Sequence, residues 1–199
     1  MDRLEFARAL AQMQEAERVA HSVPDPLFEM MSRCQEAENL RYLGDVARTL
    51  EIAGECQTFA QQHLGETADS LPICVLAKAL NDVGRHEEAH VQIHGLLERS
   101  VQQHGAASGL YFGIFDILAC IASRVDQHNT AAQLFGAADG DAKRARQRRS
   151  RNSAWAIEAY IQRSNEALGD DVYMSLHRTG EAMMLVDAID YARKFQIRA

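Results

Sequence analysis

The chain has 199 residues, enough for one domain or a short repeat array but too few for two catalytic domains. Hydrophobic residues make up 47% and aromatic residues 7%, with only 3 prolines, a composition that favours helix over sheet. The net charge of −7 argues against nucleic-acid or anionic-membrane binding by the chain as a whole.

The sequence holds no run of about 18 apolar residues, and its N-terminus lacks the basic end and apolar block of a signal peptide. Cys34, Cys56, Cys74 and Cys120 are widely spaced and form no C-x-x-C pair, so neither a zinc ribbon nor a disulfide framework is indicated. We therefore expect a cytoplasmic protein without membrane contact, in which the cysteines are reduced and mostly buried.

Helical spacing of apolar residues begins near the N-terminus. Residues 2–20 predict an amphipathic helix that ends at the two prolines of "HSVPDP". From Leu27 to about His63 the pattern predicts at least two helices, with breaks near Glu38 to Asn39 and near Gly54.

The next segment predicts a helical hairpin, with helices over about 72–83 and 86–103 and a tight turn at Gly84. Its apolar and small residues resemble the tetratricopeptide repeat pattern, although no proline closes the repeat. The matching positions are Ile73, Leu76, Ala77, Leu80, Gly84, His86, Ala89, Ile93 and Leu96.

The same pattern recurs 42 residues downstream, at Leu118, Ala119, Ala122, Ala131, Phe135 and Ala138. It recurs loosely 30 residues upstream, with Gly54 in the place of the turn glycine. We therefore predict an all-α fold of tetratricopeptide-like helical hairpins stacked into an α-solenoid. Residues 1–199 would form a single domain, with irregular hairpins over 1–139 and a C-terminal helical extension, or cap, over 140–199.

The order of blocks over residues 70–199 resembles the C-terminal tetratricopeptide-like region of large bacterial signal-transduction ATPases of the LuxR-type and adenylate-cyclase-associated kind. The blocks are Leu134 to Ala138, then Leu168 and Gly169, then Gly180, and a last helix with Ala182, Met183, Leu185, Asp187, Ala188 and Ala192. The resemblance implies an interaction or sensing region that serves the effector domains of a larger regulator. Neither a phosphate-binding loop nor a compact helix-turn-helix is present, so we expect a fragment or a shortened relative.

The string H-E-E-A-H at residues 86–90 matches the zinc-protease pattern, in which two histidines bind the metal and the glutamate activates water. In the hairpin, however, His86 occupies the position after the turn where the repeat pattern has a large side chain. Glu87 lies in the first turn of the second helix, where a negative charge interacts favourably with the helix dipole. His94 follows too closely to be the third ligand of a metzincin. We favour a solvated and partly packed histidine edge, with a zinc-dependent hydrolase or an incidental zinc or nickel site as alternatives.

A basic segment, residues 143–151, interrupts the acidic chain, which without its six cations would carry −13. We expect these residues to pair with acids of this chain or a second copy and to bind DNA weakly; a nucleic-acid contact remains an alternative. Trp155 and Tyr160, which follow at helical spacing, are expected in the core. The six cations are Lys143, Arg144, Arg146, Arg148, Arg149 and Arg151.

The sequence thus predicts a non-catalytic module for protein interaction, oligomerisation or ligand sensing in a bacterial transcriptional or signalling regulator. No catalytic residue, cofactor or metal ligand is assigned, because nothing in the sequence ties a nucleophile to a base. A concave groove would present Lys78, Asn81 and Asp116 to a partner. The basic segment would add Arg144, Arg146, Arg148 and Arg149.

Overall fold

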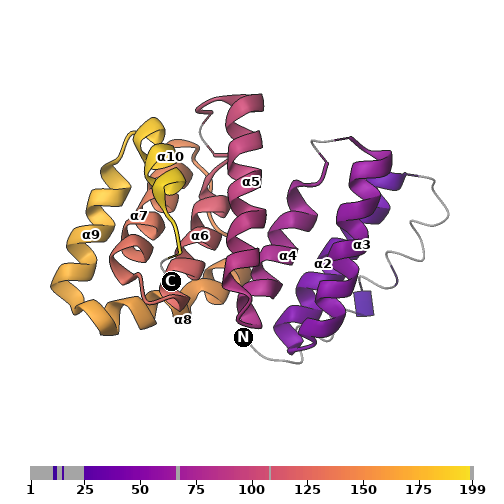
Figure 1. The fold of residues 1–199 in the computed structure, drawn as a ribbon, viewed down its shortest axis with the longest axis horizontal. Coiled ribbons are helices and arrows are strands. Elements are labelled where there is room, and N and C mark those ends of the chain that lie inside the picture. The colour runs from indigo at the N-terminus through magenta and orange to yellow at the C-terminus, as the bar shows by residue number, and fades with distance from the viewer. Residues whose placement is uncertain (1–10, 13–14, 16–24, 66–67, 108, 198–199) are drawn as a thin grey trace. The chain divides into compact units, whose positions relative to one another are not determined.

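The computed structural model describes residues 11–12, 15, 25–65, 68–107 and 109–197, and among these it contains helices and no strands. The predicted all-α fold of helical hairpins is confirmed (Figure 1). Most of the helix predicted over residues 2–20 lies outside the described residues. In the described part, the helices are α2 (Pro26–Leu43), α3 (Val46–His63), α4 (Ser70–Asp82), α5 (His86–His104), α6 (Phe112–Arg124), α7 (His128–Arg144), α8 (Arg151–Leu168), α9 (Asp170–Ala182) and α10 (Leu185–Lys194).

None of the helices in the described ranges combines the length and the apolar character that a bilayer crossing requires. Contacts within the chain group it into two compact units, residues 1–85 and 86–199, which are described separately. In the first unit α3 packs against both α2 and α4, and in the second α7 packs against α6, α8, α9 and α10. The boundary between the units falls just after the Gly84 turn, whereas the predicted change of pattern falls after residue 139.

One kind of turn follows α2, α4 and α6, and it recurs after α7. A residue with positive φ follows the helix, and the next amide donates to the carbonyl five residues back, which is the Schellman arrangement. The positive-φ residues are Gly44, Gly84 and Asp126. The bonds run from Asp45 N to Leu40 O (3.0 Å), from Arg85 N to Leu80 O (2.9 Å) and from Gln127 N to Ala122 O (2.9 Å).

The breaks predicted near Glu38 to Asn39 and near Gly54 are wrong. α2 continues through Glu38 and Asn39, whose side chains are buried, so their polarity marks an internal contact and not a loop. Gly54 lies within α3. A glycine inside a helix lowers stability by about 1 kcal/mol relative to alanine, and the packing of α3 outweighs this loss. The first hairpin therefore turns at Gly44, which lies 40 residues before Gly84, and the predicted offset of 30 is also wrong.

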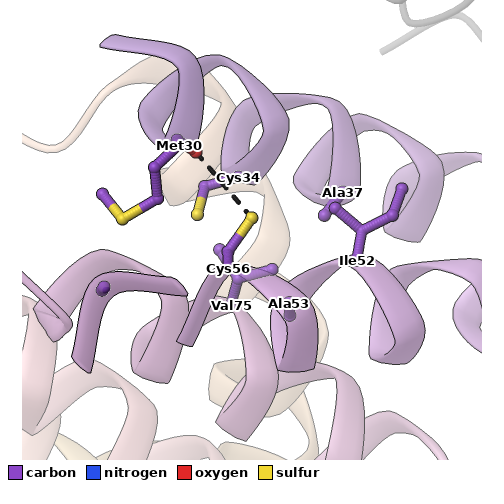
Figure 2. Packing of buried hydrophobic residues seen from close by; sticks show 8 residues of the cluster. Met30, Cys34, Ala37, Ile52, Ala53, Cys56 and Val75 are labelled. Atoms are coloured by element: carbon purple, nitrogen blue, oxygen red, sulfur yellow. Dashed lines mark hydrogen bonds between the residues drawn. The ribbon is translucent and has the colours of Figure 1, made fainter. Parts of the chain in front are cut away.

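Small apolar side chains form the core of the first unit (Figure 2). Cys34 and Cys56 belong to this core, as the sequence indicates, and all four cysteines are free thiols. The core residues shown are Met30, Cys34 and Ala37 from α2, Ile52, Ala53 and Cys56 from α3, and Val75 from α4.

The core of the second unit includes every position that the downstream repeat predicts. α6 and α7 form an antiparallel pair around the Asp126 turn, and their facing residues are buried. These residues are Leu118, Ala119, Ala122, Ala131, Phe135 and Ala138.

Glycines allow the backbones of α7 and α9 to touch. A Cβ atom on Gly136 would lie 2.0 Å from the His177 carbonyl oxygen, and one on Gly180 would lie 1.9 Å from the Gln133 carbonyl oxygen. Real Cβ atoms do not approach an oxygen so closely, so both positions require glycine. α9 therefore packs on α7 more closely than helices separated by side chains can.

The C-terminal helices match one of the three features predicted from the resemblance, the helix end at Leu168 and Gly169. They differ in the position of Gly180 and in the start of the last helix. α8 ends at Leu168, and Gly169 follows it with a φ of 80°. Gly180, in contrast, lies inside α9, where it serves the contact with α7. The last helix begins at Leu185, so Ala182 and Met183 precede it.

Replacing Gly180 with Ala should destabilise the protein by at least about 3 kcal/mol, because two backbones must separate to admit the methyl group. Gly54→Ala is the matched control: no atom outside its own helix lies near that site, and the change should raise stability by up to about 1 kcal/mol. Urea denaturation measures both effects. Equal stability of Gly180→Ala and the native chain would refute the close contact.

Candidate interaction surface

The basic segment forms the connection between α7 and α8 and is bent in a defined way at both ends. Arg146 follows α7 with a φ of 54°, and Gln147 N donates to the Ala142 carbonyl at 2.8 Å, which repeats the turn described above. At the other end, Ser150 Oγ accepts from Ser153 N at 3.1 Å and caps α8. The segment is therefore an ordered loop.

Three of its six cations anchor this loop to the second unit. Lys143 forms an ion pair with Glu181, and Arg144 Nη1 donates to the Met183 carbonyl at 3.0 Å. The Arg149 guanidinium donates to both oxygens of Asp116, at 2.6 and 2.7 Å. The prediction that the basic segment contacts acids of its own chain therefore holds for Lys143 and Arg149.

The Arg149 guanidinium also bonds Asp139 and so links two carboxylates from α6 and α7. His177 Nε2 lies 3.0 Å from the other oxygen of Asp139. Burial alone would raise the pKa of Asp139, but His177 and Arg149 outweigh it and hold the pKa below its usual value. The cluster thus joins the loop to three helices, because Asp116 lies on α6, Asp139 on α7 and His177 on α9.

Arg149→Gln should destabilise the protein by about 3 kcal/mol, because it leaves the carboxylates of Asp116 and Asp139 without their shared cation. Arg148→Gln, one residue away and exposed, should change stability by no more than about 0.5 kcal/mol. Thermal unfolding of the two variants side by side tests the assignment. Similar melting temperatures for both would contradict it.

The remaining cations, Arg146, Arg148 and Arg151, point to solvent, and within the described residues none of them has a hydrogen bond or ion pair. Trp155 follows Arg151 by one helical turn on α8 and keeps 39% of its surface exposed. These four residues, called the basic surface below, combine unpaired positive charge with a large aromatic side chain.

The prediction that Trp155 belongs to the core is therefore wrong, since it lies on the outward face of α8. Tyr160 is half-buried, and the Arg124 guanidinium lies 5.6 Å from its ring centroid. Helical spacing alone could not show that Trp155 is exposed and Tyr160 half-buried, because α8 has only one fully buried residue, Ser164.

The three residues predicted to line a groove are all engaged in their own units. In the first unit Lys78 Nζ lies 3.0 Å from Glu38 Oε1, and Asn81 is only 2% exposed. In the second unit Asp116 is held by Arg149 and is 7% exposed. The sequence analysis predicted Asp116 as a groove residue and Arg149 as part of the basic segment, without relating the two. The structure shows that they bind each other.

Lys78 belongs to a network that joins α2 to α4. Glu38 accepts from Lys78, from Arg41 and from the Tyr42 hydroxyl, while Arg41 also donates to Asp82 at 2.8 Å. Burial alone would raise the pKa of Glu38, but the two cations outweigh it and lower the pKa to about 2. Four buried or half-buried charges are thereby balanced in pairs.

Because its pKa is lowered, Glu38 contributes stability that is present above about pH 4.5 and is lost as the pH falls toward 2. Glu38→Gln should therefore cost about 3 kcal/mol at pH 7, and the difference from the native chain should shrink in acid. Denaturant unfolding at pH 7 and pH 3 measures this change. Glu51→Gln, which breaks an exposed pair with Arg48, is the control and should cost less than about 1 kcal/mol at either pH.

His90, from the zinc-protease string, and His94, one helical turn after it, hold the C-terminal segment of the second unit. His90 Nε2 lies 3.0 Å from the Phe195 carbonyl oxygen, and His94 Nε2 lies 3.2 Å from that of Arg193. Since a carbonyl can only accept, both ring nitrogens donate. Burial lowers the pKa of His90, which favours this neutral ring. Among the described residues, no group of three or more potential ligands is arranged to hold a metal ion.

Ser164, His128 and Asp126 form a series of polar contacts that the sequence does not reveal. Ser164 Oγ lies 3.3 Å from His128 Nδ1, and His128 Nε2 lies 3.4 Å from Asp126. Ser164 is fully buried and donates its proton to Ser123 Oγ, so no substrate can reach it as a nucleophile. The series joins α8 to the start of α7 and to the turn before it, and the bond to Ser123 joins α8 to α6.

Comparison with models of known protein families, with curated proteins and with solved structures finds no match to this chain.

Proposed function

We propose that this chain is a non-catalytic protein-interaction module of a bacterial transcriptional or signalling regulator, and that it binds an acidic protein partner through the basic surface. The proposal rests on the observation that three cations of the basic segment are paired within the unit and three are not. Lys143, Arg144 and Arg149 fix the loop, while Arg146, Arg148 and Arg151 extend from it without partners among the described residues.

Arginine and tryptophan support a protein partner, because these side chains are enriched among the residues that dominate binding energy at protein interfaces. Three arginines on a chain of net charge −7 give a small positive area, which suits a compact acidic surface better than a long polyanion such as DNA. A second copy of this acidic chain is one partner of this kind. Self-association therefore falls within the proposal.

The resemblance of residues 70–199 to the C-terminal region of LuxR-type signal-transduction ATPases supports the regulatory context. In that context the module would connect the effector domains of a larger regulator to a partner. The four free cysteines suit a reducing compartment, and we include a cytoplasmic location in the proposal.

The experiment uses Trp155, which is the only tryptophan of the chain and so reports on this surface by its fluorescence. A polyglutamate peptide added at low salt should change the Trp155 emission, and Arg148→Gln/Arg151→Gln should weaken the apparent affinity about tenfold. The matched control, Arg178→Gln/Lys194→Gln, removes two other exposed charges from the same unit and should have little effect.

Equal weakening by the two double variants would show that net charge alone attracts the peptide, and the proposed surface would fail. Duplex DNA is titrated in parallel at physiological salt. A sequence-selective complex with DNA, lost in Arg148→Gln/Arg151→Gln, would replace the protein partner with a nucleic acid. Sedimentation of the native chain over a range of concentrations shows whether a second copy is the partner.

A further inference from the structure

Two thiols from neighbouring helices meet in the core of the first unit. Cys34 lies on α2 and is fully buried, and Cys56 lies on α3 with 1% of its surface exposed. Figure 2 shows the two sulfur atoms next to each other, and the interaction with Cys56 is the main cause that raises the pKa of Cys34. The pair is therefore in direct contact before any chemistry takes place.

The surroundings of the two thiols differ. Cys56 Sγ donates to the Met30 carbonyl oxygen at 3.9 Å, since a carbonyl can only accept. The neighbouring Cys56 sulfur and burial both raise the pKa of Cys34, so Cys34 stays a thiol.

A small cavity borders Cys56, and Cys34 is not among the residues that line it. Its volume is about 20 Å³, which is room for about one water molecule. Arg33 and Glu29 also line the cavity, and the Arg33 guanidinium forms an ion pair with Glu55. A bulky disulfide such as oxidised glutathione cannot enter this space. The lining residues are Glu29, Met30, Arg33, Cys56 and Phe59.

We propose that Cys34 and Cys56 form a modification site for small hydroperoxides, which oxidise the pair to a disulfide that links α2 to α3. Cys56 is the attacking residue, because it borders the cavity. Cys34 is the resolving residue, because it lies in contact with Cys56 and away from the cavity. The proposal concerns the first unit and does not rest on the proposed function.

The reaction balances with one molecule of hydrogen peroxide. The Cys56 thiolate attacks one peroxide oxygen, the O–O bond breaks, and the hydroxide that leaves takes up the proton released by the thiol and becomes water. The sulfur of Cys34 then attacks the sulfenic acid of Cys56. An S–S bond forms, the S–O bond breaks, and a second water leaves with the Cys34 proton. The two thiols lose two electrons, and the peroxide gains them.

The test uses the full native chain with either hydrogen peroxide or oxidised glutathione, followed by alkylation of free thiols and peptide mass spectrometry. Each oxidation rate is divided by the rate for the same reagent and the chain unfolded in guanidinium, which removes differences in intrinsic reactivity. We expect this folded-to-unfolded ratio to be at least about tenfold larger for the peroxide. The product should be a Cys34–Cys56 disulfide with the loss of two hydrogens.

Variants assign the two roles. Cys34→Ser should stop at a sulfenic acid on Cys56, which dimedone traps, and Cys56→Ser should leave Cys34 as a thiol. Cys120→Ser, in the other unit, is the control and should form the disulfide as the native chain does. Circular dichroism checks that each variant is folded, and the comparison of reagents on the native chain needs no variant.

Three results would overturn the proposal. The first is conversion of Met30, which also lines the cavity, to its sulfoxide while both thiols survive. The second is equal folded-to-unfolded ratios for the two reagents, which would mean that oxidation requires opening of the core and that the cavity plays no part. The third is a disulfide that pairs either cysteine with Cys74.

Discussion

The second unit depends on the contact that Gly136 and Gly180 allow between α7 and α9. Because the backbones touch there, the side of α9 that carries His177 and Glu181 lies against the end of α7. This brings His177 to Asp139, and it brings Glu181 within reach of Lys143. The Lys143–Glu181 pair and the contact of His177 with Asp139 therefore depend on the close approach of the two backbones.

The two charged networks define geometry more than they add stability. Glu38 with its cations in the first unit, and Arg149 with its carboxylates in the second, must each give up hydration, and the ion pairs roughly repay that cost. What the networks provide is direction, since a guanidinium that bonds two carboxylates fits only one arrangement of its neighbours. In the first unit this fixes α2 against α4, and in the second it fixes the loop against α6 and α7.

The sequence predicts those parts of the fold that depend on local spacing. The helices on either side of Gly84 and the hairpin around Asp126 follow from apolar periodicity and from residues suited to positive φ. Gly54 misled the prediction because a glycine inside a helix and a glycine at a turn look alike in one sequence, and only the tertiary packing separates them. The real turn glycine, Gly44, is followed by an N-capping aspartate, Asp45, and this pair is the signal that could have located it.

For the candidate surface, the sequence shows which residues are charged but not which of them are neutralised. Asp116 and Arg149 lie 33 positions apart, so their pairing depends on the packing of α6 against the loop after α7. The exposure of Trp155 likewise depends on which side of α8 the rest of the unit covers. Both are tertiary outcomes, and a single sequence contains no local pattern that predicts them.

Arg146 shows how the loop presents its unpaired cations. Its φ of 54° is a conformation that costs a non-glycine residue about 1 kcal/mol, and its side chain recovers none of this cost through contacts with described residues. The loop holds the conformation because Arg144 and Arg149 anchor it on both sides. Glycine would suit the backbone better there, so within the unit the arginine side chain brings no stability. In the proposed interaction, its charge would meet the partner at a position that the surrounding anchors fix in advance, which would lower the entropy that association must overcome.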